Sequence, residues 1–167
     1  TGNIASFTAI NAGSTPVTAT ITVTPRFTNG GITCTGATST FTITVNPTAV
    51  VNQPANQLLC NGATTSAVVF SGLPPGSTYN WTNSNTAIGL GASRTGNIPA
   101  FTATNTTAAP ITATITVTPT STGCGGLPVS FTITVNPTPS VNAIANQTVC
   151  AGANTTAVSI SGPVAGT

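Results

Sequence analysis

An internal repeat of 90 to 94 residues restricts the fold of this chain more than any other feature of the sequence. Residues 18–25 (TATITVTP) recur unchanged at 112–119, and residues 41–47 (FTITVNP) recur at 131–137. The two offsets differ because the second copy of the intervening loop is four residues shorter. This period is too long for one coil of a solenoid and is typical of tandem sandwich domains. We therefore expect an all-β chain of tandem immunoglobulin-like β-sandwich repeats with no helices.

Two Asn-Pro-Thr segments, at 46–48 and 136–138, predict the boundaries between repeats. Proline ends a strand at such a position and stiffens a short linker. We expect one complete repeat over 48–137, the C-terminal part of a preceding repeat over 1–47, and the N-terminal part of a following repeat over 138–167. Because half a sandwich exposes strand edges, we expect that a longer polypeptide or neighbouring copies complete these two parts.

Threonine alternates with apolar residues along residues 17–23 and 41–45. A period of two predicts strands with one face in the core and the other in water. The two segments are expected to be the last two strands of a repeat, joined by a loop that carries Cys34 in one repeat and Cys124 in the next. Further strands are expected over 67–70, 78–82 and 100–105, with a turn at 73–76.

The composition excludes most chemistry. The sequence has no Asp, Glu or His, and its two basic residues are Arg26 and Arg94. Acid–base and nucleophilic catalysis require a titratable base, so we expect no catalytic residues and no enzymatic activity. Without carboxylates or paired cysteine motifs, no metal site and no cofactor are expected. A net charge of +2 provides no footprint for nucleic acid, and no apolar run in this segment is long enough to span a membrane.

Tyr79 and Trp81 lie two residues apart and share one face of an expected strand. One interpretation is a sugar-stacking platform, and the other is the core tryptophan of an immunoglobulin-like sandwich. We favour Trp81 as a core aromatic residue, because the chain has only one Trp and one Tyr. An ice-binding role for the threonine ladders is disfavoured, since such sheets twist. Arg26 and Arg94 are expected in solvated loops.

The four cysteines, Cys34, Cys60, Cys124 and Cys150, are candidates for structural disulfides, which suits an oxidising exterior and repeats with modest cores. Three connectivities remain open. One joins Cys60 to Cys124 inside the complete repeat. A second joins the first turn of one repeat to the hairpin tip of the next, because these lie at opposite poles of an immunoglobulin-like unit. The third joins Cys34 to Cys60 and Cys124 to Cys150.

Several segments resemble the PKD-like repeats of giant surface proteins of Bacteroidota. The segments are 78–83 (TYNWTN), 88–90, 95–99, 101–105, 131–137, and the pair 59–62 and 149–152. The resemblance covers essentially the whole chain. It implies sandwich units in long arrays, exported across the outer membrane by the type IX route, as in gliding-motility adhesins of the SprB kind. It supplies no catalytic or ligand residues, and this sequence lacks the acidic calcium ligands that many PKD modules carry at their junctions.

These features together predict a structural role. We expect the shaft or spacer of an extracellular adhesin or filament on the bacterial cell surface, mediating attachment or gliding through a distal tip. Two alternatives remain open: repeats that themselves bind polysaccharide or surfaces, and a polymeric fibre of short subunits completed by strand exchange. The expected partners are neighbouring repeats, other copies in a filament bundle, and surface polysaccharide.

Overall fold

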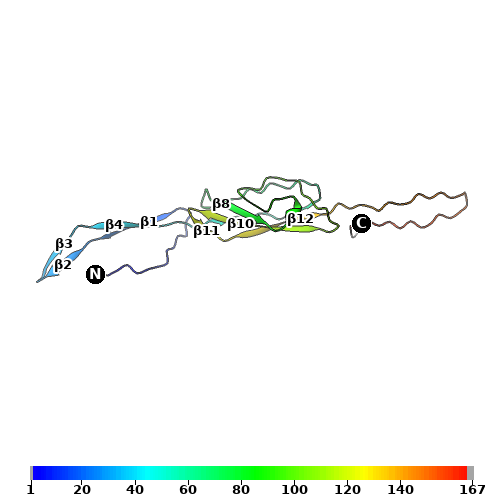
Figure 1. Cartoon of the computed structure of the whole chain (residues 1–167). Coiled ribbons are helices and arrows are strands. Elements are labelled where there is room, and N and C mark those ends of the chain that lie inside the picture. Colours follow the sequence, from blue (N-terminus) through cyan, green and yellow to red (C-terminus); the bar gives the residue numbers. More distant parts are fainter. Residues whose placement is uncertain (1, 165–167) are drawn as a thin grey trace.

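The computed structural model describes residues 2–164, which form an elongated all-β chain (Figure 1). A hairpin extends from one end of a central domain, and an extended C-terminal segment leaves the other end. The only helical element in this range is a 3₁₀ turn, η1 (Thr86–Ile88). The strands are β1 (Val17–Val23), β2 (Arg26–Asn29), β3 (Ile32–Thr35), β4 (Ser39–Val45), β5 (Val50–Val51), β6 (Gln57–Cys60), β7 (Gly72–Leu73), β8 (Thr78–Asn83), β9 (Ser93–Thr95), β10 (Ile111–Ser121), β11 (Cys124–Gly125) and β12 (Val129–Asn136).

The central domain contains one main sheet with the strand order β6-β12-β10-β8-β9, and β11 pairs with the end of β10. Strand β10 is antiparallel to both β12 and β8, whereas β6 runs parallel to β12. A second, less regular layer covers the inner face of this sheet. It contains the short β5–β7 pair and two isolated bridges, Thr64↔Thr102 and Val68↔Ile98.

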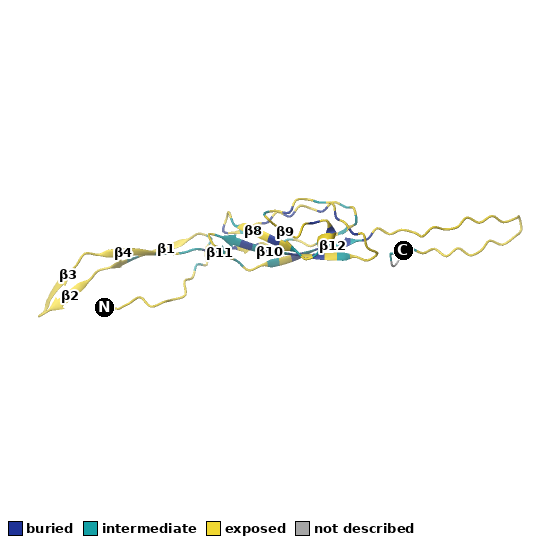
Figure 2. Cartoon of the chain, in the orientation of Figure 1, coloured by how far each residue is buried: buried dark blue, intermediate teal, exposed yellow. Residues whose placement is uncertain are grey.

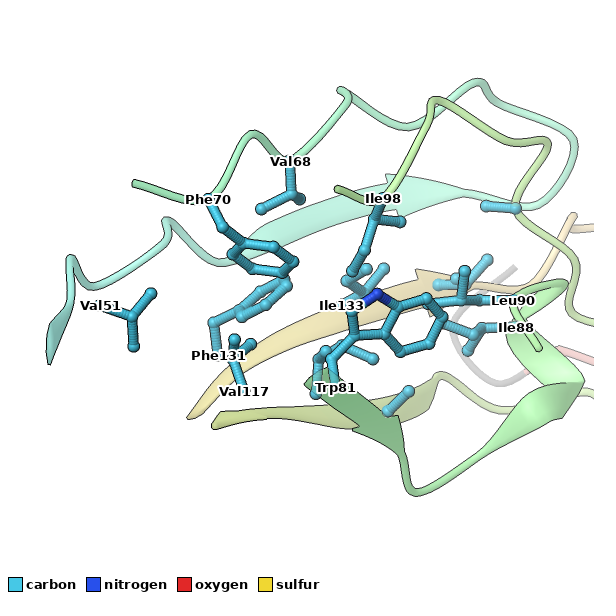
Figure 3. Packing of buried hydrophobic residues seen from close by; sticks show 14 residues of the cluster. Val51, Val68, Phe70, Trp81, Ile88, Leu90, Ile98, Val117, Phe131 and Ile133 are labelled. Atoms are coloured by element: carbon cyan, nitrogen blue, oxygen red, sulfur yellow. The ribbon is translucent and has the colours of Figure 1, made fainter. Parts of the chain in front are cut away.

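The hydrophobic core lies between these two layers, as Figure 3 shows. The period-two alternation of β10 and β12 places their apolar residues inward and their threonines outward. The buried inner-face residues of these strands are Ala113, Ile115, Val117, Phe131, Ile133 and Val135. Val68, Phe70 and Ile98 from the second layer pack against them. On the outer face, hydroxyls pair across the strands, as between Thr112 and Thr134 Oγ1 at 2.9 Å.

The predictions of strands at 78–82, 17–23 and 41–45 are confirmed by β8, β1 and β4. The strands predicted at 67–70 and 100–105 are reduced to one isolated bridge each, at Val68 and at Thr102. Backbone bonds, such as that from Val68 N–H to the carbonyl oxygen of Ile98 at 2.9 Å, are interrupted there by bonds to side chains. The backbone N–H of Phe70 donates to Asn97 Oδ1 at 3.0 Å, and that of Phe101 donates to Thr65 Oγ1 at 3.0 Å.

The segments on either side of the central domain repeat its local geometry without its core. Strands β1 and β4 pair in the register of β10 and β12, so that Ile21 faces Phe41 as Ile115 faces Phe131. Ile4 and Phe7 line a hollow together with Val17, Ala19 and Ile21 of this hairpin, but they do not bury it. The hairpin is exposed along most of its length (Figure 2). The whole chain exposes 11053 Å². A compact protein of 16.3 kDa is expected to expose about 7,500 Å².

Candidate functional site

The hollows on the central domain are open to solvent. One lies over β8, β9 and β10 and is lined by Asn80, Trp81, Thr82, Ser93, Arg94, Thr95, Thr116 and Thr118. Among residues 2–164, no three His, Cys, Asp or Glu side chains lie close enough together to hold a metal ion. The same residues include no helix with the length and apolar character needed to cross a membrane.

Trp81 lies in the core and is 3% exposed (Figure 3). Its indole Nε1–H donates to the carbonyl oxygen of Gly96 at 3.0 Å, which satisfies the only polar atom of the ring. Tyr79 lies on the same face of β8, and its ring centroid is 5.7 Å from that of Phe70. Because the ring of Trp81 is covered, it is not available to stack on a sugar.

Both arginines were expected in loops, but the structure places them in strands. Arg26 begins β2 and pairs with Thr35, whereas Arg94 lies in β9 and pairs with Trp81. Both residues are exposed. Arg26 belongs to the β2–β3 pair that extends the N-terminal hairpin, and Arg94 to the short edge strand β9, which pairs with β8.

The most elaborate polar arrangements lie at the two poles of the central domain. At the first pole, Pro47 and Ala49 are buried where the chain enters from β4. The amide Nδ2 of Asn46 donates to the carbonyl oxygen of Thr122, at the tip of the β10–β11 hairpin, over 3.4 Å. Gly126, which follows this tip, lies so close to Ala49 that an added Cβ would be 1.8 Å from the carbonyl oxygen of Ala49. The entering chain and the hairpin tip are therefore in contact.

At the second pole, the first turn of the domain contacts the segment that leaves it. The backbone N–H of Asn61 donates to the carbonyl oxygen of Asn136 at 2.8 Å, and its side-chain Nδ2 donates to Thr138 Oγ1 at 3.1 Å. Asn105 is 3% exposed, and its Nδ2 donates to the carbonyl oxygens of Ala109 and Val135, each at 2.8 Å. These bonds fix the end of β12 where it continues into the C-terminal segment.

The same polar arrangement occurs at the base of the N-terminal hairpin. Asn11, which is the repeat equivalent of Asn105, donates from Nδ2 to the carbonyl oxygens of Thr15 and Val45, each at 2.8 Å. Thr15 and Val45 are the equivalents of Ala109 and Val135. Sequence reasoning missed these asparagines, although the recurrence of Asn11 as Asn105 was a usable signal.

No disulfide links the four cysteines within the described residues: Cys34, Cys60 and Cys150 are exposed, and Cys124 is partly exposed. Two of them mark the poles of the central domain. Cys60 ends β6 opposite Asn136 at the second pole, and Cys124 begins β11 opposite Ser121 at the first. Cys34 was expected in a loop, but it lies in β3, where it pairs with Phe27.

The part of the chain that carries the main sheet and most of the core matches a known family. None of the curated proteins matches the chain. Residues 57–139 match the family described as the PKD-like domain. Such domains are generally extracellular repeat modules of a non-catalytic fold, in keeping with the sandwich described above. The central part of this chain, residues 57–139, is therefore similar to PKD-like domains, and its sandwich fold is consistent with theirs.

Proposed function

We propose that the chain is a section of the shaft of an extracellular bacterial adhesin or surface filament. In this proposal 48–137 is one complete repeat, 1–47 is the C-terminal part of the preceding repeat, and 138–167 is the N-terminal part of the following one. Thr1 and residues 165–167 lie outside the described residues. The shaft holds a distal tip away from the cell, and the tip makes the specific contact.

The observation that carries this proposal is that both outer segments keep the geometry of the central repeat while their apolar residues lie uncovered. Val141 is 61% exposed, whereas its equivalent Val51 is 4% exposed. Ile160 is 70% exposed, whereas its equivalent Phe70 is 7% exposed. Apolar side chains at such positions favour burial by about 1.5–3 kcal/mol each. They fit segments whose sandwich partners are the remaining parts of the same two repeats.

The hydrogen bonds of the C-terminal segment support the same assignment. Gln147 exchanges two bonds with the backbone of Thr156, of 2.8 and 2.9 Å. Gln57 and Ser66 exchange the same pair in the central repeat, at 2.9 and 3.0 Å. This shared hydrogen-bond pattern supports the proposal that the segment is the first part of a following repeat.

We further propose that the parent protein belongs to the giant surface proteins of Bacteroidota, exported by the type IX route and used in attachment or gliding. The resemblance of the repeat segments and the match to the PKD-like domain family support this assignment. The expected partners are neighbouring repeats, with other copies in a bundle and surface polysaccharide as further candidates.

The test is to delete whole repeats from the parent protein on the cell surface. Removing two or three repeats at the Asn-Pro boundaries should shorten the fibre in electron micrographs in proportion to the residues removed. Binding specificity should stay unchanged, because the tip is intact. The matched control removes half a repeat more, so that the two joined positions are not equivalent, which should disrupt folding locally. Loss of specificity after an in-frame deletion would contradict the shaft proposal and favour repeats that bind directly.

A further inference from the structure

We infer that consecutive repeats are joined covalently by a disulfide between the first turn of one repeat and the hairpin tip of the next. In the numbering of this chain, Cys60 pairs with the equivalent of Cys124 in the following repeat, and Cys124 pairs with the equivalent of Cys60 in the preceding one. The inference rests on the proposed tandem arrangement and adds a chemical link to each joint.

The structure first excludes a bond within the repeat. Cys60 lies level with Asn136, one residue beyond the pair Val135↔Ile111 at the second pole. Cys124 lies level with Ser121 at the opposite end of β10. Eleven residue steps, from the level of Pro110 to Ser121, separate these two levels, which corresponds to about 36 Å of extended strand. A disulfide requires a Cα separation below about 7 Å, so Cys60 and Cys124 cannot pair with each other.

Bonds between the cysteines on either side of a linker are excluded in the same way. Cys34 lies in β3 near the far end of the hairpin, which points away from the central domain (Figure 1). Cys60 lies at the opposite pole of that domain. Cys150 lies at the turn of the C-terminal segment, where the N–H of Ala153 donates to its carbonyl oxygen at 3.1 Å. That segment leaves the domain at the pole opposite Cys124.

The remaining arrangement is a bond between consecutive repeats. In a tandem array, the second pole of one repeat meets the first pole of the next. At the second pole, Cys60 is the parallel cross-strand partner of Asn136, one strand spacing of about 4.8 Å away. At the first pole, the equivalent asparagine is Asn46, and its side chain contacts Thr122, two residues before Cys124. The first-turn cysteine of one repeat and the hairpin-tip cysteine of the next therefore flank the same asparagine.

The hairpin tip varies in length, but the position of its cysteine does not. The N-terminal hairpin is four residues longer at its tip than the central one. The extra residues lie beyond the cysteine, because Cys34 pairs with Phe27 and Cys124 pairs with Ser121. Phe27 and Ser121 each follow the strand proline, Pro25 or Pro119, by two residues. The cysteine thus keeps the same position along the hairpin in both repeats, and a cross-link at each boundary requires this.

Formation of the disulfide needs an oxidant, and a protein disulfide or a small-molecule disulfide would serve. The thiolate of one cysteine attacks this disulfide, and the second cysteine resolves the mixed disulfide. The two thiols lose two electrons and two protons in all, and the oxidant is reduced to two thiols. Both cysteines are accessible for this exchange, since Cys60 is exposed and Cys124 is partly exposed.

The test is peptide mapping of the native polypeptide after its free thiols are alkylated, with digestion under non-reducing conditions. We expect Cys60 in a peptide linked to the hairpin tip of the following repeat, and Cys124 in one linked to the first turn of the preceding repeat. Alkylated Cys60 and Cys124, or a peptide linking them to each other, would overturn the inference. If the parent sequence has neighbouring repeats and its cysteines are all alkylated, only the disulfide fails. If it has no neighbouring repeats, the shaft proposal fails as well.

A single substitution gives a sharper readout. Cys60→Ser in the native polypeptide should add one alkylated thiol, at the hairpin tip of the following repeat, and leave Cys124 oxidised. A bond within the repeat would instead release Cys124. The matched control is Cys124→Ser, which should release the first-turn cysteine of the preceding repeat and leave Cys60 oxidised. Because Cys60 ends an exposed strand, serine should be accommodated without loss of the fold.

Discussion

Replacing Phe131 by alanine should destabilise the central domain strongly, whereas the same change at Phe41 should have almost no effect on this chain. Both phenylalanines occupy one repeat position and face an isoleucine across the strand pair. Phe131 is 1% exposed and Phe41 is 45% exposed. The two substitutions thus compare the same side chain, at the same position of the strand pair, where it is buried and where it is partly exposed.

The expected magnitude follows from the burial. Removing a fully buried phenylalanine side chain costs about 3–5 kcal/mol of unfolding free energy, through lost transfer energy and the remaining cavity. In a domain of about 90 residues each kcal/mol lowers Tm by about 4–8 °C, so Phe131→Ala should lower Tm by at least about 12 °C. Phe41→Ala leaves no closed cavity, and we expect a change within about 0.5 kcal/mol.

The assay is urea unfolding of the 167-residue chain, followed by Trp81 fluorescence and far-UV circular dichroism. Fluorescence reports the central domain alone, because Trp81 is the only tryptophan and lies in its core. A loss below about 1 kcal/mol for Phe131→Ala would refute the assigned core. In a longer chain that includes the whole preceding repeat, Phe41→Ala should cost as much as Phe131→Ala. If Phe41→Ala stayed neutral there, 1–47 would not be part of a sandwich.

Three further predictions concern the joint, the core and the solvent. Gly126→Ala should lower the unfolding free energy by about 1–3 kcal/mol, because its Cβ would clash with the carbonyl oxygen of Ala49. The adjacent Gly125→Ala is the control: a Cβ there meets open space, so the unfolding free energy should not change. Thermal unfolding of both variants measures the difference. Trp81→Phe should cost about 1–3 kcal/mol by circular dichroism, because the carbonyl of Gly96 loses its donor. Unfolding free energy should change by less than about 0.5 kcal/mol between about pH 5 and pH 7, since no carboxylate or imidazole side chain exists through which protons could act. A chelator should leave Tm unchanged for the same reason.

The main sheet was predictable because its signal is local. In β10 and β12 every second residue is apolar, and the same residues are buried. A strand with one face in water and one in the core must show this alternation, so the sequence of a single strand is enough to predict it. The repeat adds a second signal, since the register of β1 with β4 follows from that of β10 with β12.

The second layer was only partly predictable, because its backbone bonds, such as Val68 N–H to the carbonyl oxygen of Ile98, are interrupted by bonds between side chains and backbone. Ser66 pairs with the side chain of Gln57, and Phe70 with that of Asn97. Such bonds depend on which loops meet in space, and no period in the sequence encodes that. The poles share this difficulty: Asn46 contacts Thr122 across 76 residues, so its role appears only once both strands are placed.

The joints are held by neutral groups, and this has a consequence for stiffness. Where Asn46 meets Thr122 and Asn61 meets Thr138, amides bond to a carbonyl and a hydroxyl, and no ion pair can form in a chain without carboxylate side chains. Each such bond contributes about 0.5–1.5 kcal/mol and involves no formal charge for salt to screen. Buried prolines such as Pro47 limit the remaining backbone freedom of the linker. A shaft joined in this way should keep one bending stiffness from low to high ionic strength, whereas a shaft held by calcium or ion pairs would soften as these are removed or screened.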